Sequence, residues 1–345
     1  MTVRLWLAAA VASCACPPSL GSATSELRSS QRSSQRSSRW WMLAGGPWNE
    51  DLPFYNASYV ARAVALASAS RASMTGVYLF LPLSVQVAAG GNASEAFVVA
   101  DDATMAAVVP PFLQLGLTVS GSIWVDPAVV RSGAALQAVA NLTAAAERHN
   151  LTALFVDFEG QSDPLMAALL ARFVAALSAA LHAVGRAAEM AVDAAGILDQ
   201  YGLYAAAGAD RLMTMATYNG WRAETPAGLS RLSGVVDAEL QANVSRSQLA
   251  VAVGSMIVGE RADGSGTPCP DASGTNLNYQ WTQAGLADFV AWLEQRGVRH
   301  LDVYRCDLCI LNSTTEQWLL DATAQWLGGG RLEGVVAAGR DRFAS

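Results

Sequence analysis

The sequence predicts a single-domain α/β protein folded as a (β/α)8 TIM barrel, and three observations lead to this prediction. From Trp40 onward, short apolar runs typical of strands alternate with longer Ala-rich stretches of helical period. No two consecutive strand candidates are joined by a two-residue hairpin turn, so long crossovers and a parallel sheet are expected. Eight strand candidates spread over about 290 residues match the size of such a barrel.

The strand candidates are short and rich in apolar residues, and most of the longer gaps between them carry a helical pattern. They are the segments 40–44, 76–82, 117–124, 153–158, 188–193, 211–218, 249–256 and 299–304. The clearest helix candidates are 58–70, 128–148, 164–184 and 282–295. Asp126, which precedes Pro127, is expected to cap the second of these helices. A doubly wound open sheet is the alternative, which is disfavoured because no G-x-G-x-x-G follows the first strand.

The two ends of the chain are predicted to lie outside the barrel domain. Residues 1–23 are predicted to be a secretory signal peptide, with Arg4 before an apolar run at 5–12 and small residues at 21–23 as the cleavage site. An uncleaved anchor is the alternative, but the apolar run is short for a membrane span. The Ser/Arg-rich stretch 24–39 is expected to be a disordered linker, 40–330 the barrel and 331–345 a C-terminal tail without a lipid-anchor pattern.

The charge balance of the chain argues against nucleic acid as a partner. The chain has 22 basic and 29 acidic residues, so its formal net charge is −7. The first 39 residues hold five Arg and one Glu, so the remaining body has a formal charge of 17 − 28 = −11. Such an acidic body lacks the basic footprint needed for nucleic acid. After the signal peptide, no segment has the unbroken apolar length of a membrane span, so none is expected once the signal is removed. The sequence does not indicate an oligomeric state.

Asparagine usage agrees with export. Six of the ten Asn residues start an N-x-[ST] sequon: Asn56, Asn92, Asn141, Asn150, Asn243 and Asn312. This share is higher than the Ser and Thr content gives by chance, although chance matches are the alternative. We therefore expect a glycoprotein that is secreted or that stays in the secretory pathway, in a vacuolar or a lysosomal lumen.

Five cysteines are present, and two of them leave with the signal peptide. Cys269 falls in the loop after the seventh strand, whereas Cys306 and Cys309 follow the eighth. Neighbouring strands of a barrel bring these loops together, and an oxidising compartment favours a disulfide between Cys269 and either Cys306 or Cys309. No second ligand pair or histidine stands at metal-ligand spacing, so no metal site is expected.

Two carboxylates mark the candidate active site. The apolar strand 153–158 ends in Asp157, and Glu159 follows two residues later, which places both side chains on one face. Acidic groups are costly to bury without a purpose, and the carboxyl ends of barrel strands are where catalytic groups lie. A structural ion pair with Arg211 or Arg305 is the alternative interpretation.

Aromatic and polar residues follow several of the other strands. Those proposed to contact a substrate are Trp124, Tyr218, Asn219, Trp221 and Tyr304. Aromatic rings next to carboxylates suit a sugar, whose C–H faces stack on rings while its hydroxyl groups meet polar atoms. The sequence has no phosphate-binding Gly loop and no Ser nucleophile elbow, and no cofactor is expected. Asp193 and Glu260 remain as candidates for the second carboxylate of an ordinary retaining glycosidase.

The run ALFVDFE at 153–159 resembles the fourth strand of family 18 glycoside hydrolases, the chitinases, whose signature is D-x-x-D-x-D-x-E. The segment GLTVSGSIW at 116–124 is similar to their third strand, and ATYN at 216–219 is similar to their sixth. The resemblance implies that Glu159 is the general acid, with Asp157 as its supporting carboxylate and Tyr218 as the family's tyrosine. It also implies a substrate-assisted mechanism, in which the N-acetyl oxygen of the glycan attacks the anomeric carbon.

The sequence departs from the family pattern at several positions. Thr152 and Phe155 stand where the first two Asp residues of the signature are expected, Asn219 replaces an Asp, and Tyr304 replaces a Trp. The first hypothesis is a hydrolase acting on β-linked N-acetylhexosamine glycans. The second is a catalytically inactive chitinase-like lectin, which the loss of Asp at Phe155 favours and the presence of Glu159 disfavours. A barrel hydrolase of different chemistry is the third.

Overall fold

The computed structural model describes residues 36–42, 57–69, 74–87, 95–158, 164–192, 201–214, 226–254, 256–257, 280–281, 283–306 and 326. These residues belong to one compact unit that runs from Arg36 to Ser345. In parts of its helices and strands, including residues 40–42 and 304–306, only the backbone is described.

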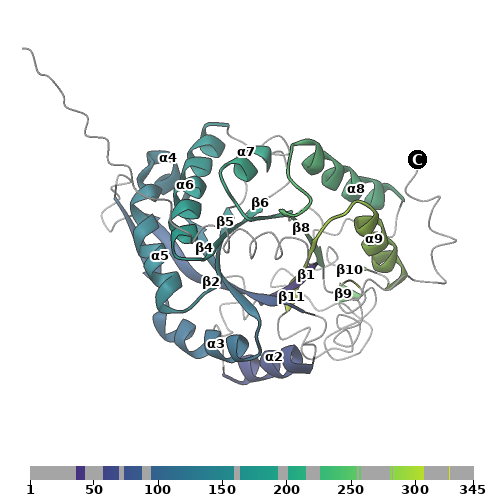
Figure 1. Cartoon of the computed structure of the whole chain (residues 1–345), viewed down its shortest axis with the longest axis horizontal. Coiled ribbons are helices and arrows are strands. Elements are labelled where there is room, and N and C mark those ends of the chain that lie inside the picture. Colours follow the sequence, from purple (N-terminus) through teal and green to yellow (C-terminus); the bar gives the residue numbers. More distant parts are fainter. Residues whose placement is uncertain are drawn as a thin grey trace, which may run out of the picture. The chain divides into compact units, whose positions relative to one another are not determined.

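Eight parallel strands form a closed ring. The sheet order is β1-β11-β8-β7-β6-β5-β4-β2-β3, and parallel pairing between β1 and β2 closes the ring. Its strands are β1 (Ser37–Met42), β2 (Gly76–Val87), β4 (Thr118–Val125), β5 (Ala153–Phe158), β6 (Ala187–Val192), β7 (Arg211–Thr214), β8 (Leu249–Gly254) and β11 (His300–Cys306). Each corresponds to one of the predicted strands, so the (β/α)8 barrel is confirmed (Figure 1).

Among the described residues, three further strands lie outside the ring, and the sequence did not predict them as separate strands. β3 (Ala96–Ala100) pairs antiparallel with the end of β2 and forms the last strand of the sheet. The two-residue strands β9 (Met256–Ile257) and β10 (Gln280–Trp281) pair with each other.

The helices surround the ring of strands, as Figure 1 shows. They are α2 (Ala57–Ala69), α3 (Asp102–Gln114), α4 (Pro127–Ser132), α5 (Val139–Arg148), α6 (Pro164–Ala183), α7 (Tyr201–Ala206), α8 (Pro226–Gln241) and α9 (Gln283–Gln295), with the 3-10 helix η1 (Ala134–Ala138) between α4 and α5. The predicted helices at 58–70, 164–184 and 282–295 are confirmed by α2, α6 and α9 within one residue at each end.

The predicted helix at 128–148 is wrong in one respect, because it is three helices. Asp126 caps α4 as expected, since its side chain accepts a hydrogen bond of 2.8 Å from the backbone N–H of Ala128. Gly133 then adopts a left-handed conformation with φ of 78° and ends α4. A residue with a side chain rarely adopts this conformation, so the glycine breaks a pattern whose apolar period continues on both sides.

Alternate residues of each strand face opposite sides of the sheet. On β5, Leu154, Val156 and Phe158 belong to the apolar core that the outer helices cover, whereas Phe155 and Asp157 face the inside of the ring. Helix α6 covers this part of the sheet. It is long and apolar enough to cross a membrane by length and composition alone, but half of that stretch is buried in the protein, as in the core helix of a folded barrel.

The first strand begins earlier than predicted. β1 starts at Ser37, inside the stretch that the composition assigns to a disordered linker ending at Arg39. Ser37 N donates to the carbonyl of Arg299 at 3.0 Å, and the side chain of Arg39 forms an ion pair with Glu189 of β6. Pairing of β1 with β11 and β2 therefore overrides the low intrinsic preference of a Ser-rich segment for structure.

Glu239 of α8 provides a pH-dependent contribution to stability. Its carboxyl group is fully buried, and burial raises its pKa from 4.5 to about 8, although hydrogen bonds from Thr214 and Tyr201 partly oppose the rise. The folded state therefore holds a proton that the unfolded state releases above pH 4.5. The stabilisation is complete below that pH and is lost as the pH rises to about 8, by up to about 1.4 kcal/mol per pH unit.

We therefore expect Glu239→Gln, which keeps the shape of the neutral acid, to weaken the loss of stability between pH 5 and pH 8. Urea denaturation of the wild type and the variant at both pH values measures this change. If the free energy of unfolding changes equally between pH 5 and pH 8 in the wild type and the variant, Glu239 is not a buried, protonated group.

Candidate active site

The carboxyl ends of the barrel strands meet at one rim, and two of the predicted site residues lie there side by side. Asp157 of β5 and Trp124 of β4 are register partners on neighbouring strands. Both face the inside of the ring, since each lies two residues beyond an inward-facing residue, Phe155 and Ser122 respectively. Asp157 is 7 % exposed, whereas Trp124 is 41 % exposed. The rim thus presents a mostly buried carboxylate next to an open indole ring.

The remaining predicted site residues are only partly covered by the structure. Tyr304 lies in β11, paired with Trp41 on one side and Gly254 on the other, and only its backbone is described. The following predicted residues lie outside the described residues: Glu159, Tyr218, Asn219, Trp221, Asp193, Glu260, Cys269 and Cys309. Glu159 follows the last residue of β5 and stays a prediction, and so does the disulfide.

Below Asp157, two aromatic rings pack against each other inside the barrel. Phe155 is fully buried, and its ring contacts that of Tyr78 of β2 with a centroid distance of 4.7 Å and a tilt of 48°. Thr152, which precedes β5, fixes the start of that strand: its hydroxyl group accepts from the N–H of Val119 and donates to the carbonyl of the same residue, both at 2.8 Å. Phe155 therefore packs the barrel interior, whereas Thr152 joins the start of β5 to β4 by hydrogen bonds.

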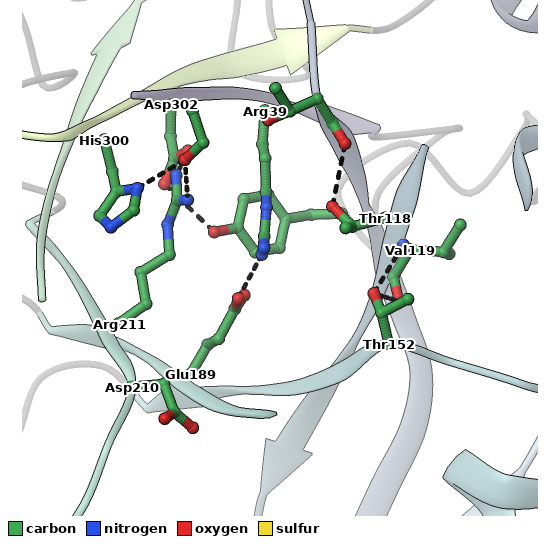
Figure 2. Close-up of polar contacts among 12 residues, drawn as sticks. Arg39, Thr118, Val119, Thr152, Glu189, Asp210, Arg211, His300 and Asp302 are labelled. Carbon is green, nitrogen blue, oxygen red and sulfur yellow. Dashed lines mark hydrogen bonds and ion pairs between the residues drawn. The ribbon is translucent and has the colours of Figure 1, made fainter. Parts of the chain in front are cut away.

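Two ion pairs lie across the barrel interior. Arg39 of β1 pairs with Glu189 of β6, and Arg211 of β7 pairs with Asp302 of β11 (Figure 2). The Tyr78 hydroxyl donates to Asp302 Oδ2 at 3.2 Å, and the two guanidinium groups lie 5.5 and 5.9 Å from the Tyr78 ring centroid. We call these four charged residues, Arg39, Glu189, Arg211 and Asp302, the interior tetrad.

The charges of the interior tetrad balance, which makes their burial tolerable. Burial raises the pKa of Asp302, while Arg211 lowers it in part. Burial also raises the pKa of Tyr78 well above its usual value. Burial lowers the pKa of Arg39, but Glu189, Tyr78 and Asp302 together outweigh this effect and raise it, so Arg39 keeps its proton.

A chain of hydrogen bonds extends from the interior tetrad toward the opposite rim. Arg211 donates to Ser37 Oγ at 2.8 Å, and Ser37 Oγ lies 2.5 Å from His300 Nδ1 (Figure 2). His300 Nε2 in turn lies 2.6 Å from the carbonyl oxygen of Ser247. Because a carbonyl only accepts, Nε2 carries the proton and Nδ1 accepts from Ser37. Burial, with the nearby Arg211, lowers the pKa of His300 well below its usual value, so this histidine is neutral.

This chain matches known proteins by structure but not by sequence. No protein-family model and no curated protein sequence matches this chain. Solved structures do match. A GH18 chitinase from Cycas revoluta, in complex with (GlcNAc)3, has a TM-score of 0.58 at 14% identity, covering 84% of this chain and 99% of its own. A chitinase from Bacteroides thetaiotaomicron has a TM-score of 0.59 at 10% identity, covering 87% and 99%.

A third structure, a class V chitinase mutant from Nicotiana tobaccum in complex with NAG4, has a TM-score of 0.58 at 10% identity and covers 85% of this chain and 99% of its own. The chain has the GH18 chitinase fold. At this level of identity the similarity concerns the fold, and the residues of the site have to be assessed on their own chemistry.

Within the chitinase fold, the sequence reasoning identified the rim and missed the interior tetrad. The signal was present, because each of the four strands β1, β6, β7 and β11 carries one of these charged residues among mainly apolar neighbours. Inward-facing parity, read on each strand, would have placed all four inside the ring. Among the described residues, no three His, Cys, Asp or Glu side chains are arranged to hold a metal ion.

Proposed function

We propose that this protein is a secreted glycoside hydrolase that cleaves β-linked N-acetylhexosamine glycans with retention of configuration. The observation that carries the proposal is the pairing of Asp157 with the exposed Trp124 at the rim of a barrel with the chitinase fold. Catalytic groups of such barrels lie at this rim, and an exposed indole suits the apolar face of a sugar. Two of the neighbouring chitinases were solved with N-acetylglucosamine oligomers.

In the proposed mechanism, Glu159 protonates the glycosidic oxygen and the bond to the leaving sugar breaks. The carbonyl oxygen of the substrate's own N-acetyl group attacks the anomeric carbon and forms a cyclic oxazolinium ion. Asp157 accepts a hydrogen bond from the acetamido N–H and stabilises the positive charge, while the Tyr218 hydroxyl donates to the acetamido oxygen. Glu159, now a carboxylate, takes a proton from the water that opens the ring, so both steps use one carboxyl group.

A chitinase-like lectin is the second candidate, and Phe155 favours it. The buried Phe155 ring fills the place below Asp157 where the family signature has an aspartate, so that carboxyl group is missing from the site. A barrel that keeps its rim and loses part of its catalytic group would bind a glycan without turning it over.

Turnover and binding, measured on the same preparation, test the proposal. We expect hydrolysis of fluorogenic N-acetyl chitooligosaccharides and no hydrolysis of the matching deacetylated compounds. Binding of N-acetylated oligomers without turnover would select the lectin. Hydrolysis of the deacetylated compounds would exclude assistance by the substrate and point to Asp193 or Glu260 as a second carboxylate.

Glycosylation gives a separate test of the secretory proposal. Asn141 on α5, Asn150 after α5 and Asn243 after α8 are exposed, and the last two lie in the turns before β5 and β8, at the end of the barrel opposite the rim. We expect the protein secreted by eukaryotic cells to lose mass on endoglycosidase treatment without losing activity, and Asn141→Gln to remove one glycan. An unchanged mass after treatment would contradict the prediction.

A further inference from the structure

An exposed apolar surface continues from the candidate active site onto a strand outside the barrel. β3 pairs with the end of β2, and its residues alternate between the two faces of the sheet. Ala96, Val98 and Ala100 pack against the apolar core, whereas Phe97 and Val99 are 39 % and 43 % exposed. Two neighbouring exposed apolar side chains on one face of an edge strand form a candidate contact surface.

The register places this surface in line with Asp157. Val99 of β3 pairs with Ser84 of β2, Ser84 pairs with Trp124 of β4, and Trp124 pairs with Asp157 of β5. Directly paired residues of adjacent strands lie on the same face of a sheet. These four residues, which we call the rim row, therefore form one line from the buried carboxylate of Asp157 to β3, the last strand of the sheet.

The chemistry of this surface suits a neutral sugar chain. Phe97 pairs with Gln86, and the Gln86 side-chain amide donates to Ser84 Oγ at 2.8 Å. Apolar side chains thus lie next to an amide and a hydroxyl group on this surface. The five side chains, Phe97, Gln86, Ser84, Val99 and Trp124, are all uncharged. Rings can stack on the C–H faces of sugars while the amide and hydroxyl groups bond to sugar hydroxyls. None of the residues named here carries a positive charge that would bind a polyanionic glycan.

We propose that Phe97 and the rim row form an extended binding surface for the glycan chain beyond the sugars at the cleavage point. This inference rests on the proposed function and specifies its substrate class as long oligomers. Three strand spacings separate Val99 from Asp157, about 14 Å, which exceeds the length of one sugar ring. Contacts this far from the reacting atoms supply binding energy that short substrates cannot use, so activity rises with chain length.

Phe97→Ala tests the inference, with Leu203→Ala as the matched control. Leu203 lies on α7 away from the rim row and is 41 % exposed, so it loses a comparable exposed apolar side chain. For Phe97→Ala we expect kcat/KM on the N-acetylglucosamine hexamer to fall about 3- to 10-fold, and kcat/KM on a fluorogenic dimer substrate to stay unchanged. Phe97→Trp should restore activity on the hexamer, and Leu203→Ala should change neither value.

The outcomes separate this inference from the proposed function. If the wild type hydrolyses both substrates and Phe97→Ala leaves the ratio of hexamer to dimer activity unchanged, the extended surface is overturned and the function stands. If the wild type neither hydrolyses nor binds any N-acetylated oligomer, the proposed function fails and this inference fails with it. For a lectin, dissociation constants for hexamer and dimer replace kcat/KM in the same comparison. Analytical ultracentrifugation that shows a wild-type dimer dissociated by Phe97→Ala would overturn it in favour of a contact between copies.

Discussion

Replacing Glu159 by Gln should lower the kcat for hydrolysis of N-acetylglucosamine oligomers by about 100-fold or more. Glutamine keeps the size and most hydrogen bonds of the side chain but has no proton to give to the leaving oxygen. In the proposed site, binding depends on the exposed Trp124, which the substitution leaves in place. The dissociation constant for an oligomer should therefore stay within a few-fold of the wild-type value, so isothermal titration and a turnover assay together isolate the chemical step.

One control variant and one variant of the second carboxylate accompany this test. Glu147→Gln makes the same change at an exposed position on α5 and should leave kcat and binding as they are. Asp157→Asn should also lower kcat strongly, because the acetamido group loses the carboxylate that holds it and balances its charge. Full activity of Glu159→Gln would remove the proposed general acid and transfer the role to Asp193 or Glu260.

The barrel and the position of its rim could be predicted from sequence because both depend on local patterns. Apolar runs of strand length, separated by helical stretches, mark all eight barrel strands, and a carboxylate at the end of such a run marks the rim. The adjacency of Trp124 and Asp157 follows from the same pattern, since consecutive parallel strands with a crossover helix usually pair.

Features that depend on pairing between distant strands could not be predicted in the same way. The partner of Arg39 lies 150 residues away on β6. Strand parity places Glu189 inside the ring, but it does not say which of the residues there pairs with Arg39. β3 has an ordinary strand pattern, but its position outside the ring is set by the unusual length of β2, which extends past β1. The strand start at Ser37 was hidden by a Ser/Arg-rich composition, which tertiary pairing overrides.

Breaking the pair between Arg211 and Asp302 should produce the largest loss of stability in the barrel. Both side chains are at most 4 % exposed, and Asp302 also accepts from the Tyr78 hydroxyl. Asp302→Ala leaves a guanidinium group and a hydroxyl group buried without this acceptor. We expect the free energy of unfolding to fall by about 3–5 kcal/mol, as is typical when one member of a buried ion pair is removed. Urea denaturation at pH 7 measures the loss.

The double variant Arg211→Met with Asp302→Leu decides whether the loss comes from the unpaired charge. Because it removes both charges, it should be more stable than Asp302→Ala alone, and the coupling in a double-mutant cycle should be large. Asp237→Ala is the matched control, since it breaks a half-exposed pair with Arg296 and should change the free energy of unfolding by about 1 kcal/mol or less. Equal losses for Asp302→Ala and Asp237→Ala would mean that water reaches the barrel interior and hydrates the charges of the interior tetrad.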